Sequence, residues 1–203
     1  MDKAQLFFAC EMRAKKDDEH GTYITGRPIV FDSKTDLGYF DEIIERGALD
    51  KTDLKDVKFL VNHNTDGIPL ARSRNNNKNS TMQLIPNEEG LDIRVNLDTE
   101  RNSEARALYS AIERGDISGM SFMFGIDGEE WSELDSDHPT RHIKSISKVF
   151  EVSAVTFPAY DATEISARCK STLDNVRSAL DSAKSNDNEL ELLKLKNAIL
   201  GGI

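Results

Sequence analysis

The chain has 203 residues, of which 38% are hydrophobic and 31% charged, and its formal net charge is −10. This length allows one domain with a sizeable core, or one domain followed by a tail. The acidic balance argues against a phosphate-binding surface, which needs clustered lysine and arginine, so we expect no nucleic acid partner.

The first half of the chain predicts strands joined by polar turns. Residues 3–12 and 22–31 are expected to be two strands separated by a polar turn that ends in glycine. The apolar run at residues 6–10 is too short for a signal-peptide core or a membrane span, so we expect a cytoplasmic protein with no membrane partner. Adjacent isoleucines and a terminating glycine at residues 40–49 predict a short helix.

Residues 57–63 alternate apolar and polar side chains, which predicts a half-buried strand. His63 continues the apolar side of that alternation and is followed by a turn rich in asparagine and glycine. Residues 80–85 and 90–97 are expected to form a hairpin around a polar turn that contains proline.

A helix is predicted over residues 103–114, with Asn102 as its N-cap and an apolar stripe at spacings of three and four. The next strand is expected at residues 120–126, where Ser121 and Met123 share one face. The acidic residues 127–139 are expected to form a hairpin or an excursion, and one or two strands follow over residues 141–157.

The character of the sequence changes near residue 171, where apolar residues begin to recur at helical spacing. A second amphipathic pattern follows a polar break. We therefore expect a strand-rich domain over residues 1–168 and an amphipathic helical tail over residues 169–203. Such a tail must bury its apolar stripe on a partner, on another copy or on its own core.

Two serines are candidate nucleophiles. Ser121 stands on a predicted strand directly after a turn, which supplies a rigid mount and an open approach. Ser118 is the runner-up, although its place in the turn also suits a hydrogen bond that stabilises the turn. By residue type alone, a small polar residue on a solvated strand face explains Ser121 better than a nucleophile does.

An activated serine also needs a base and a group that orients the base. His63 is the candidate base because it ends an apolar strand, although a histidine bonded to backbone at the core edge fits the same pattern. Glu151 is a carboxylate within an apolar strand, so it needs either water or a partner such as a histidine. His142 is the runner-up for the third role, or a cross-strand surface residue.

Metal and thiol chemistry are weaker alternatives. His138 and His142 stand four residues apart behind two aspartates, but Pro139 separates them and a solvated acidic loop explains them better. Cys10 and Cys169 form no motif, lack a basic environment, and are expected to be free thiols. We therefore expect no metal and no cofactor.

Four segments together resemble the prohead proteases of tailed bacteriophages, whose fold is related to that of the herpesvirus assembly protease. They are GALD (residues 47–50), VNHN around His63, GDISGMSF (residues 115–122) and EVSAVTFPAY (residues 151–160). The resemblance covers residues 5–168. It implies an α+β, mainly β fold, with a closed or nearly closed antiparallel β-barrel flanked by helices and followed by the helical tail.

By this resemblance His63 is the base, Ser121 the nucleophile and Glu151 the third member. It implies a serine endopeptidase that cuts scaffold segments from the major capsid protein, and itself, inside the immature capsid in the host cytoplasm. Self-association is also implied. Met123 and Ala71 stand where the family often has glycine. Met123 and the charged tail leave an alternative: a weakly active or inactive family member that acts as a capsid scaffold or assembly chaperone. An unrelated β-barrel binding module is the third possibility.

Overall fold

The structure is a computed structural model that describes residues 3–8, 12–18, 21–75, 79–156 and 169–184. The strands of its two sheets are β1 (Lys3–Phe8), β2 (Arg13–Asp17), β3 (Gly21–Val30), β4 (Lys34–Asp36), β5 (Asp41–Ile44), β6 (Asp56–Val61), β7 (Ala71–Arg74), β8 (Met82–Asn87), β9 (Gly90–Asn96), β10 (Gly119–Ser132) and β11 (Thr140–Val155). Helix α1 spans Ser103–Glu113, and residues 169–184 form a second helix.

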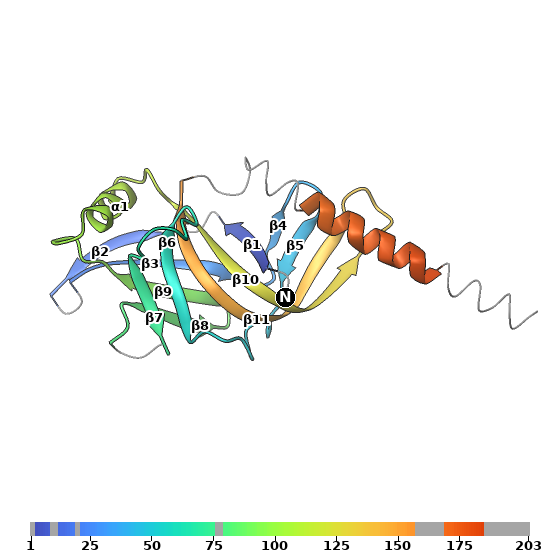
Figure 1. Cartoon of the computed structure of the whole chain (residues 1–203), viewed down its shortest axis with the longest axis horizontal. Coiled ribbons are helices and arrows are strands. Elements are labelled where there is room, and N and C mark those ends of the chain that lie inside the picture. The colour runs from blue at the N-terminus through green and yellow to red at the C-terminus, as the bar shows by residue number, and fades with distance from the viewer. Residues whose placement is uncertain (1–2, 9–11, 19–20, 76–78, 157–168, 185–203) are drawn as a thin grey trace, which may run out of the picture.

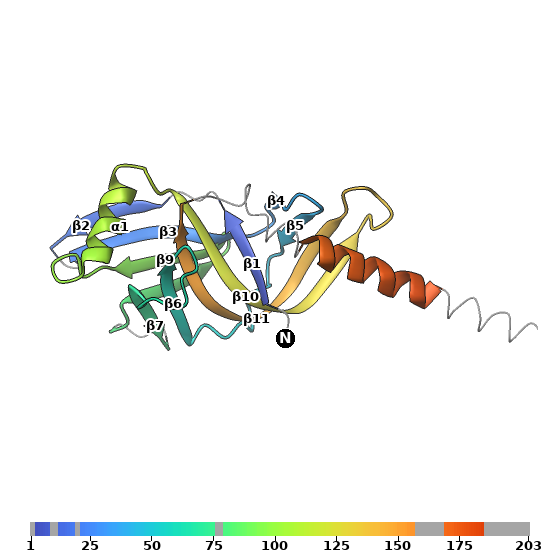
Figure 2. The same ribbon diagram turned by 45° about the horizontal axis from the view of Figure 1, so that its top comes forward.

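The long β10–β11 hairpin lies at the centre of the larger sheet (Figure 1). β11 pairs with β10 along one edge, and along its other edge it pairs in parallel with β5 near its start and with β6 near its end. β1 pairs with the outer edge of β10, as the turned view also shows (Figure 2). Bulges between residues 123 and 129 interrupt the register of the hairpin and allow it to curve.

The second sheet has the order β2-β3-β9-β8, and one buried apolar cluster takes side chains from both sheets. The fold is therefore mainly β. The hydrogen-bonded pairs among the described strands form a seven-stranded and a four-stranded sheet that do not close on one another. The closed or nearly closed barrel stays a prediction.

Helix α1 confirms the expected cap and stripe. The side chain of Asn102 accepts hydrogen bonds from the backbone of Glu104 and Ala105, and the buried residues of the helix are Ala105, Leu108 and Ile112. Gly115 follows with a φ of 80°, a conformation that glycine adopts without strain. The helix therefore ends at Glu113, two residues before this glycine, and five residues separate it from β10.

The helix predicted at residues 40–49 is wrong. Residues 41–44 form strand β5, which pairs with β4 on one side and with β11 on the other. Gly47 lies in the turn that follows, with a φ of 86°. Pairing with two neighbouring strands outweighs the weak local preference for a helix in so short a segment.

The helix at residues 169–184 lies against the far end of the β10–β11 hairpin (Figure 1). Cys169 and Leu173 are buried on it, and the guanidinium of Arg177 donates hydrogen bonds to the carbonyls of Leu134 and Ser136. This part of the tail therefore packs on its own core. The second amphipathic pattern lies outside the described residues, so the division into a domain and a tail stays a proposal.

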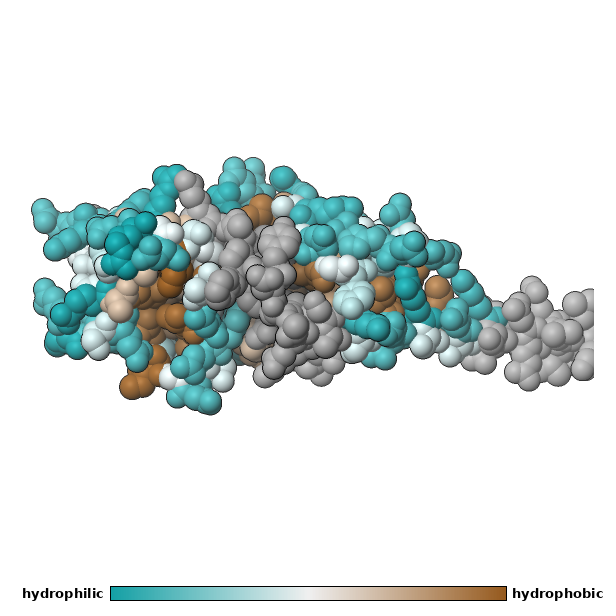
Figure 3. Space-filling view, turned by 90° about the horizontal axis from the view of Figure 1, so that it is seen from above, coloured by the Kyte–Doolittle hydropathy of each residue, from teal (hydrophilic) through white to brown (hydrophobic). Residues whose placement is uncertain are grey.

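Seen from above, apolar side chains gather mainly on the half of the molecule away from this helix (Figure 3). No helix in the described part of the chain is long and apolar enough to cross a membrane. The acidic segment at residues 127–139, predicted as a hairpin or an excursion between strands, is the outer part of the long hairpin and its turn.

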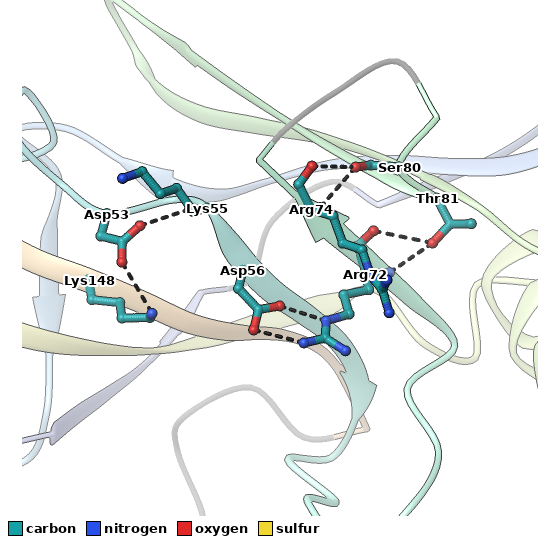
Figure 4. A network of polar contacts seen from close by, with 8 residues as sticks. All are labelled: Asp53, Lys55, Asp56, Arg72, Arg74, Ser80, Thr81 and Lys148. Atoms are coloured by element: carbon teal, nitrogen blue, oxygen red, sulfur yellow. Dashed lines mark hydrogen bonds and ion pairs between the residues drawn. The ribbon is translucent and has the colours of Figure 1, made fainter.

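Polar contacts fasten β6 to β7 (Figure 4). The guanidinium of Arg72 donates two hydrogen bonds to the carboxylate of Asp56, at 2.6 and 2.8 Å, and its backbone N–H donates to the hydroxyl of Thr81. Nearby, the ammonium of Lys148 on β11 lies 3.2 Å from the carboxylate of Asp53. These contacts join the start of β6 to its neighbours. Its far end pairs with β11, which therefore positions the residues that follow β6.

Candidate active site

A strained turn at the end of β6 carries His63. Asn62 and His63 have φ values of 49° and 56°, in the left-handed region that costs a residue other than glycine about 1–3 kcal/mol. The alternation of β6 therefore stops before His63, and the expectation that His63 continues its apolar face is wrong. β11 holds the turn: the backbone N–H of Asn62 donates to the carbonyl of Ala154, and its side-chain oxygen accepts from the backbone of Thr156.

The imidazole of His63 contacts Glu151 directly. Its Nδ1 lies 2.5 Å from Oε1 of Glu151, whose side chain is buried. The hydroxyl of Ser153 donates to the other carboxylate oxygen, Oε2, at 2.5 Å. An ionised carboxylate at Nδ1 favours the tautomer with the proton on that nitrogen, which leaves Nε2 able to accept a proton.

Ser121 lies on the neighbouring strand at the same level. It is fully buried on β10, and its partner across the β10–β11 pair is Ser153. Residues directly opposite in an antiparallel pair project to the same face, as do residues two apart along a strand. Ser121 therefore shares a sheet face with Ser153 and Glu151. Contact between its hydroxyl and the imidazole stays a prediction.

Met123 shares that face too. Its partner across the strand pair is Glu151, so a thioether side chain stands next to Ser121 along β10. The side chain is half-buried. The expectation that Met123 and Ser121 lie on one face is therefore confirmed by the register.

The two runner-up residues lie away from this arrangement. Ser118 is exposed and precedes β10 by one residue. His142 lies near the start of β11, where its Nδ1 is 3.0 Å from Glu45 Oε1 and its Nε2 is 3.0 Å from the hydroxyl of Ser132. His142 lies nine positions before Glu151 on the same strand, or roughly 30 Å away along it. His142 therefore does not pair with His63.

The third histidine within the described residues, His138, belongs to a surface cluster. His138 lies with Asp36 and Asp41, their ligand atoms all within 4.8 Å of one another, so these residues form a possible cation site. The ammonium of Lys34 is 2.8 Å from Asp41 and already neutralises that carboxylate. His138 and His142, which stand four residues apart in the sequence, have different partners: Nε2 of His138 is 3.1 Å from Asp41, and Nδ1 of His142 is 3.0 Å from Glu45.

The described cysteine is not a nucleophile. Burial, together with the nearby charge of Glu42, raises the pKa of the Cys169 thiol to about 11. A thiol with so high a pKa is protonated near neutral pH and reacts poorly. Cys10 lies outside the described residues.

Sequence reasoning missed Ser153, whose hydroxyl touches both members of the His63–Glu151 contact. Its Oγ accepts a hydrogen bond from the backbone N–H of His63 at 3.1 Å. One signal was present, since Ser153 follows Glu151 by two residues on a strand and must therefore share its face. Asn62 was also missed, because its role depends on a turn geometry that the sequence does not display.

Comparison with known proteins bears on this geometry. The chain matches the family of caudovirus prohead serine proteases over residues 9–178. It is similar to the prohead protease of Enterobacteria phage HK97, with 28% identity over 169 residues, which cover 81% of this chain and 68% of that protein. The comparison with solved structures returned no match.

Proposed function

The chain belongs to the family of caudovirus prohead serine proteases, and from this we propose that it is a serine endopeptidase with Ser121 as nucleophile, His63 as base and Glu151 as the third member. The observation that supports this most is the contact between His63 Nδ1 and a buried carboxylate, one strand away from a buried serine on the same face. A base with an orienting group, adjacent to a hydroxyl, is the arrangement that activates a serine.

The proposed reaction is acyl transfer. Ser121 Oγ attacks the scissile carbonyl carbon while its proton passes to His63 Nε2, and the electron pair of the carbonyl bond moves to oxygen. Backbone N–H groups near Ser121 hold that oxyanion. The imidazolium then gives its proton to the leaving amine as the C–N bond breaks. Water, deprotonated by the same imidazole, hydrolyses the acyl-enzyme and regenerates the hydroxyl.

We propose the scaffold segment of the major capsid protein as substrate, with self-cleavage as a second reaction. The family description places such proteases in the prohead. The reaction would therefore take place inside the immature capsid, in the host cytoplasm. The first turns of the helix at residues 169–184 already pack on the core. Its exposed side and the residues after it would therefore be the surfaces that contact the scaffold or another copy of the chain.

The test is co-expression with the major capsid protein of the same phage, followed by intact mass measurement. Wild type is expected to shorten the capsid protein and itself, and Ser121→Ala to leave both at full length. Ser118→Ala is the matched control, an exposed serine just before the same strand, and it is expected to cleave like wild type. Cleavage that persists in Ser121→Ala contradicts the assignment.

A second function has one observation in its favour. Met123 places a thioether beside Ser121 and opposite Glu151, where it would narrow the approach of a substrate. A scaffold or assembly chaperone with weak or no activity therefore remains the alternative. It predicts capsids that form normally, with no shortened capsid protein, in wild type and in Ser121→Ala, and failed assembly when residues 169–203 are deleted.

A further inference from the structure

We propose that Ser153 is a positioning residue, whose hydroxyl holds the His63 backbone and the Glu151 carboxylate in one fixed relation. The inference rests on the proposed function, since it assigns Ser153 a role in the same site. Ser153 is fully buried near the end of β11, between the strand that carries Ser121 and the turn that carries His63.

The two hydrogen bonds of Ser153 use its hydroxyl in a consistent direction. A hydroxyl has one proton to donate and lone pairs to accept with. Its proton is committed to Glu151 Oε2 at 2.5 Å, and its oxygen accepts the backbone N–H of His63 at 3.1 Å. Both interactions can therefore exist together. They connect the base and its orienting carboxylate through a path that does not include the imidazole contact itself.

Each bond restrains a motion that would disturb proton transfer. A carboxylate can rotate about its last torsion, and the bond to Oε2 stops this rotation with Oε1 directed at His63 Nδ1. The backbone of His63 has a left-handed conformation that neighbouring groups must stabilise, and the bond from its N–H to Ser153 supplies one such contact. In a buried site, a fully bonded polar network is rigid.

The same geometry argues that Ser153 is not itself the nucleophile. Its proton points to the carboxylate, on the Nδ1 side of the imidazole, whereas an attacking hydroxyl must give its proton to the other ring nitrogen, Nε2. The nucleophile of the proposed reaction is therefore Ser121, the partner of Ser153 across the β10–β11 pair.

The test compares Ser153→Ala with Ser153→Thr, which keeps the hydroxyl. Ser73→Ala is the control, because Ser73 is equally buried on β7 and its hydroxyl has no partner among the described residues. On a peptide that contains the capsid cleavage site, Ser153→Ala is expected to lower kcat by roughly 10- to 100-fold with KM little changed, as losses of orienting partners do elsewhere. Ser73→Ala is expected to keep the wild-type kcat.

A second readout does not depend on activity. In the Ser121→Ala background, the His63 Nδ1–H proton bound to a carboxylate should give a far-downfield signal in proton NMR. Ser153→Ala should abolish or broaden it, Ser153→Thr should restore it, and Ser73→Ala should leave it unchanged. An unchanged signal in folded Ser153→Ala overturns the inference, whether or not any peptide is cleaved, as does a missing signal in folded Ser153→Thr. If the wild-type protein cleaves no substrate in any assay but the NMR signal changes as expected in the Ser153 variants, only the proposed function is contradicted.

Discussion

Two carboxylates are buried in the larger sheet, and they differ in what surrounds them. Both oxygens of Glu151 have partners, the imidazole of His63 and the hydroxyl of Ser153. Glu42 on β5 is as deeply buried, but only its Oε2 accepts a bond, from Arg141 at 3.3 Å, and its Oε1 has no partner among the described residues. Two glutamates at the same depth therefore differ: hydrogen bonds to both oxygens fix the carboxylate of Glu151, whereas a single bond holds that of Glu42.

The electrostatic consequence is visible at Glu42. Burial raises its pKa to about 7; the attraction of Arg141 opposes this shift, and the nearby carboxylate of Glu129 adds to it. Arg141 must serve both acids, since it also bonds to Glu129 and lies over the ring of Trp131. Because the guanidinium of Arg141 is shared between two carboxylates and a ring, its attraction does not offset the cost of burying the charged form of Glu42. Burial of a carboxylate is therefore not by itself a sign of catalysis, and complete, directional bonding is the better criterion.

The largest expected effect comes from exchanging each acid for its amide. Glu151→Gln should lower kcat/KM by about 10²- to 10⁴-fold, because an amide cannot stabilise the imidazolium or enforce its tautomer as a carboxylate does. Glu42→Gln should leave kcat/KM unchanged, since Glu42 is remote from His63 along the sheet. Steady-state kinetics on a cleavage-site peptide would measure both. Equal losses in the two variants would erase the distinction between the acids.

The second effect is a dependence of the free energy of unfolding on pH, caused by the carboxyl group of Glu42. The folded protein binds a proton at Glu42 with a raised pKa of about 7, against an ordinary value of 4.5. Between these two values the folded state holds more protons than the unfolded state, so this group's contribution to stability is full below about 4.5 and is lost as pH rises through 7. The loss is at most about 3 kcal/mol.

Urea unfolding at pH 5 and pH 8 measures this contribution. Wild type should lose more stability than Glu42→Gln over that interval, and Glu151→Gln serves as the buried carboxylate control. If the wild-type and Glu42→Gln curves run parallel, the carboxyl of Glu42 is ionised in the fold throughout, and the contrast with Glu151 disappears.

The smallest effect concerns the turn that brings His63 to Glu151. Asn62→Gly keeps a residue that adopts a φ of 49° without strain but removes the side chain that bonds to Thr156. We expect kcat to fall by a few-fold, less than for Ser153→Ala, because the backbone bond from Asn62 to Ala154 remains. Kinetics of Asn62→Gly beside Asn62→Ala would separate side chain from backbone, since only alanine adds strain.

Local patterns predicted much of the fold. Helix α1 and its cap follow from an asparagine, an apolar stripe and a glycine that lie within one short segment. The strands around Ser121 and Glu151 follow from runs of alternating or continuous apolar residues. Residues 40–49 show where this reasoning fails, because a strand of four residues there depends on two partners far away in the sequence.

By itself the sequence determined which segments carry an imidazole, a hydroxyl and a carboxylate on or beside apolar strands, and that an acid such as Glu151 would need a partner, because these are properties of residue type and short-range period. Only the tertiary structure decided which imidazole Glu151 meets, that His63 sits in a left-handed turn, and that Ser153 joins the two. These depend on the parallel pairing of β6 with β11 across more than ninety residues of chain, whose register no local pattern specifies.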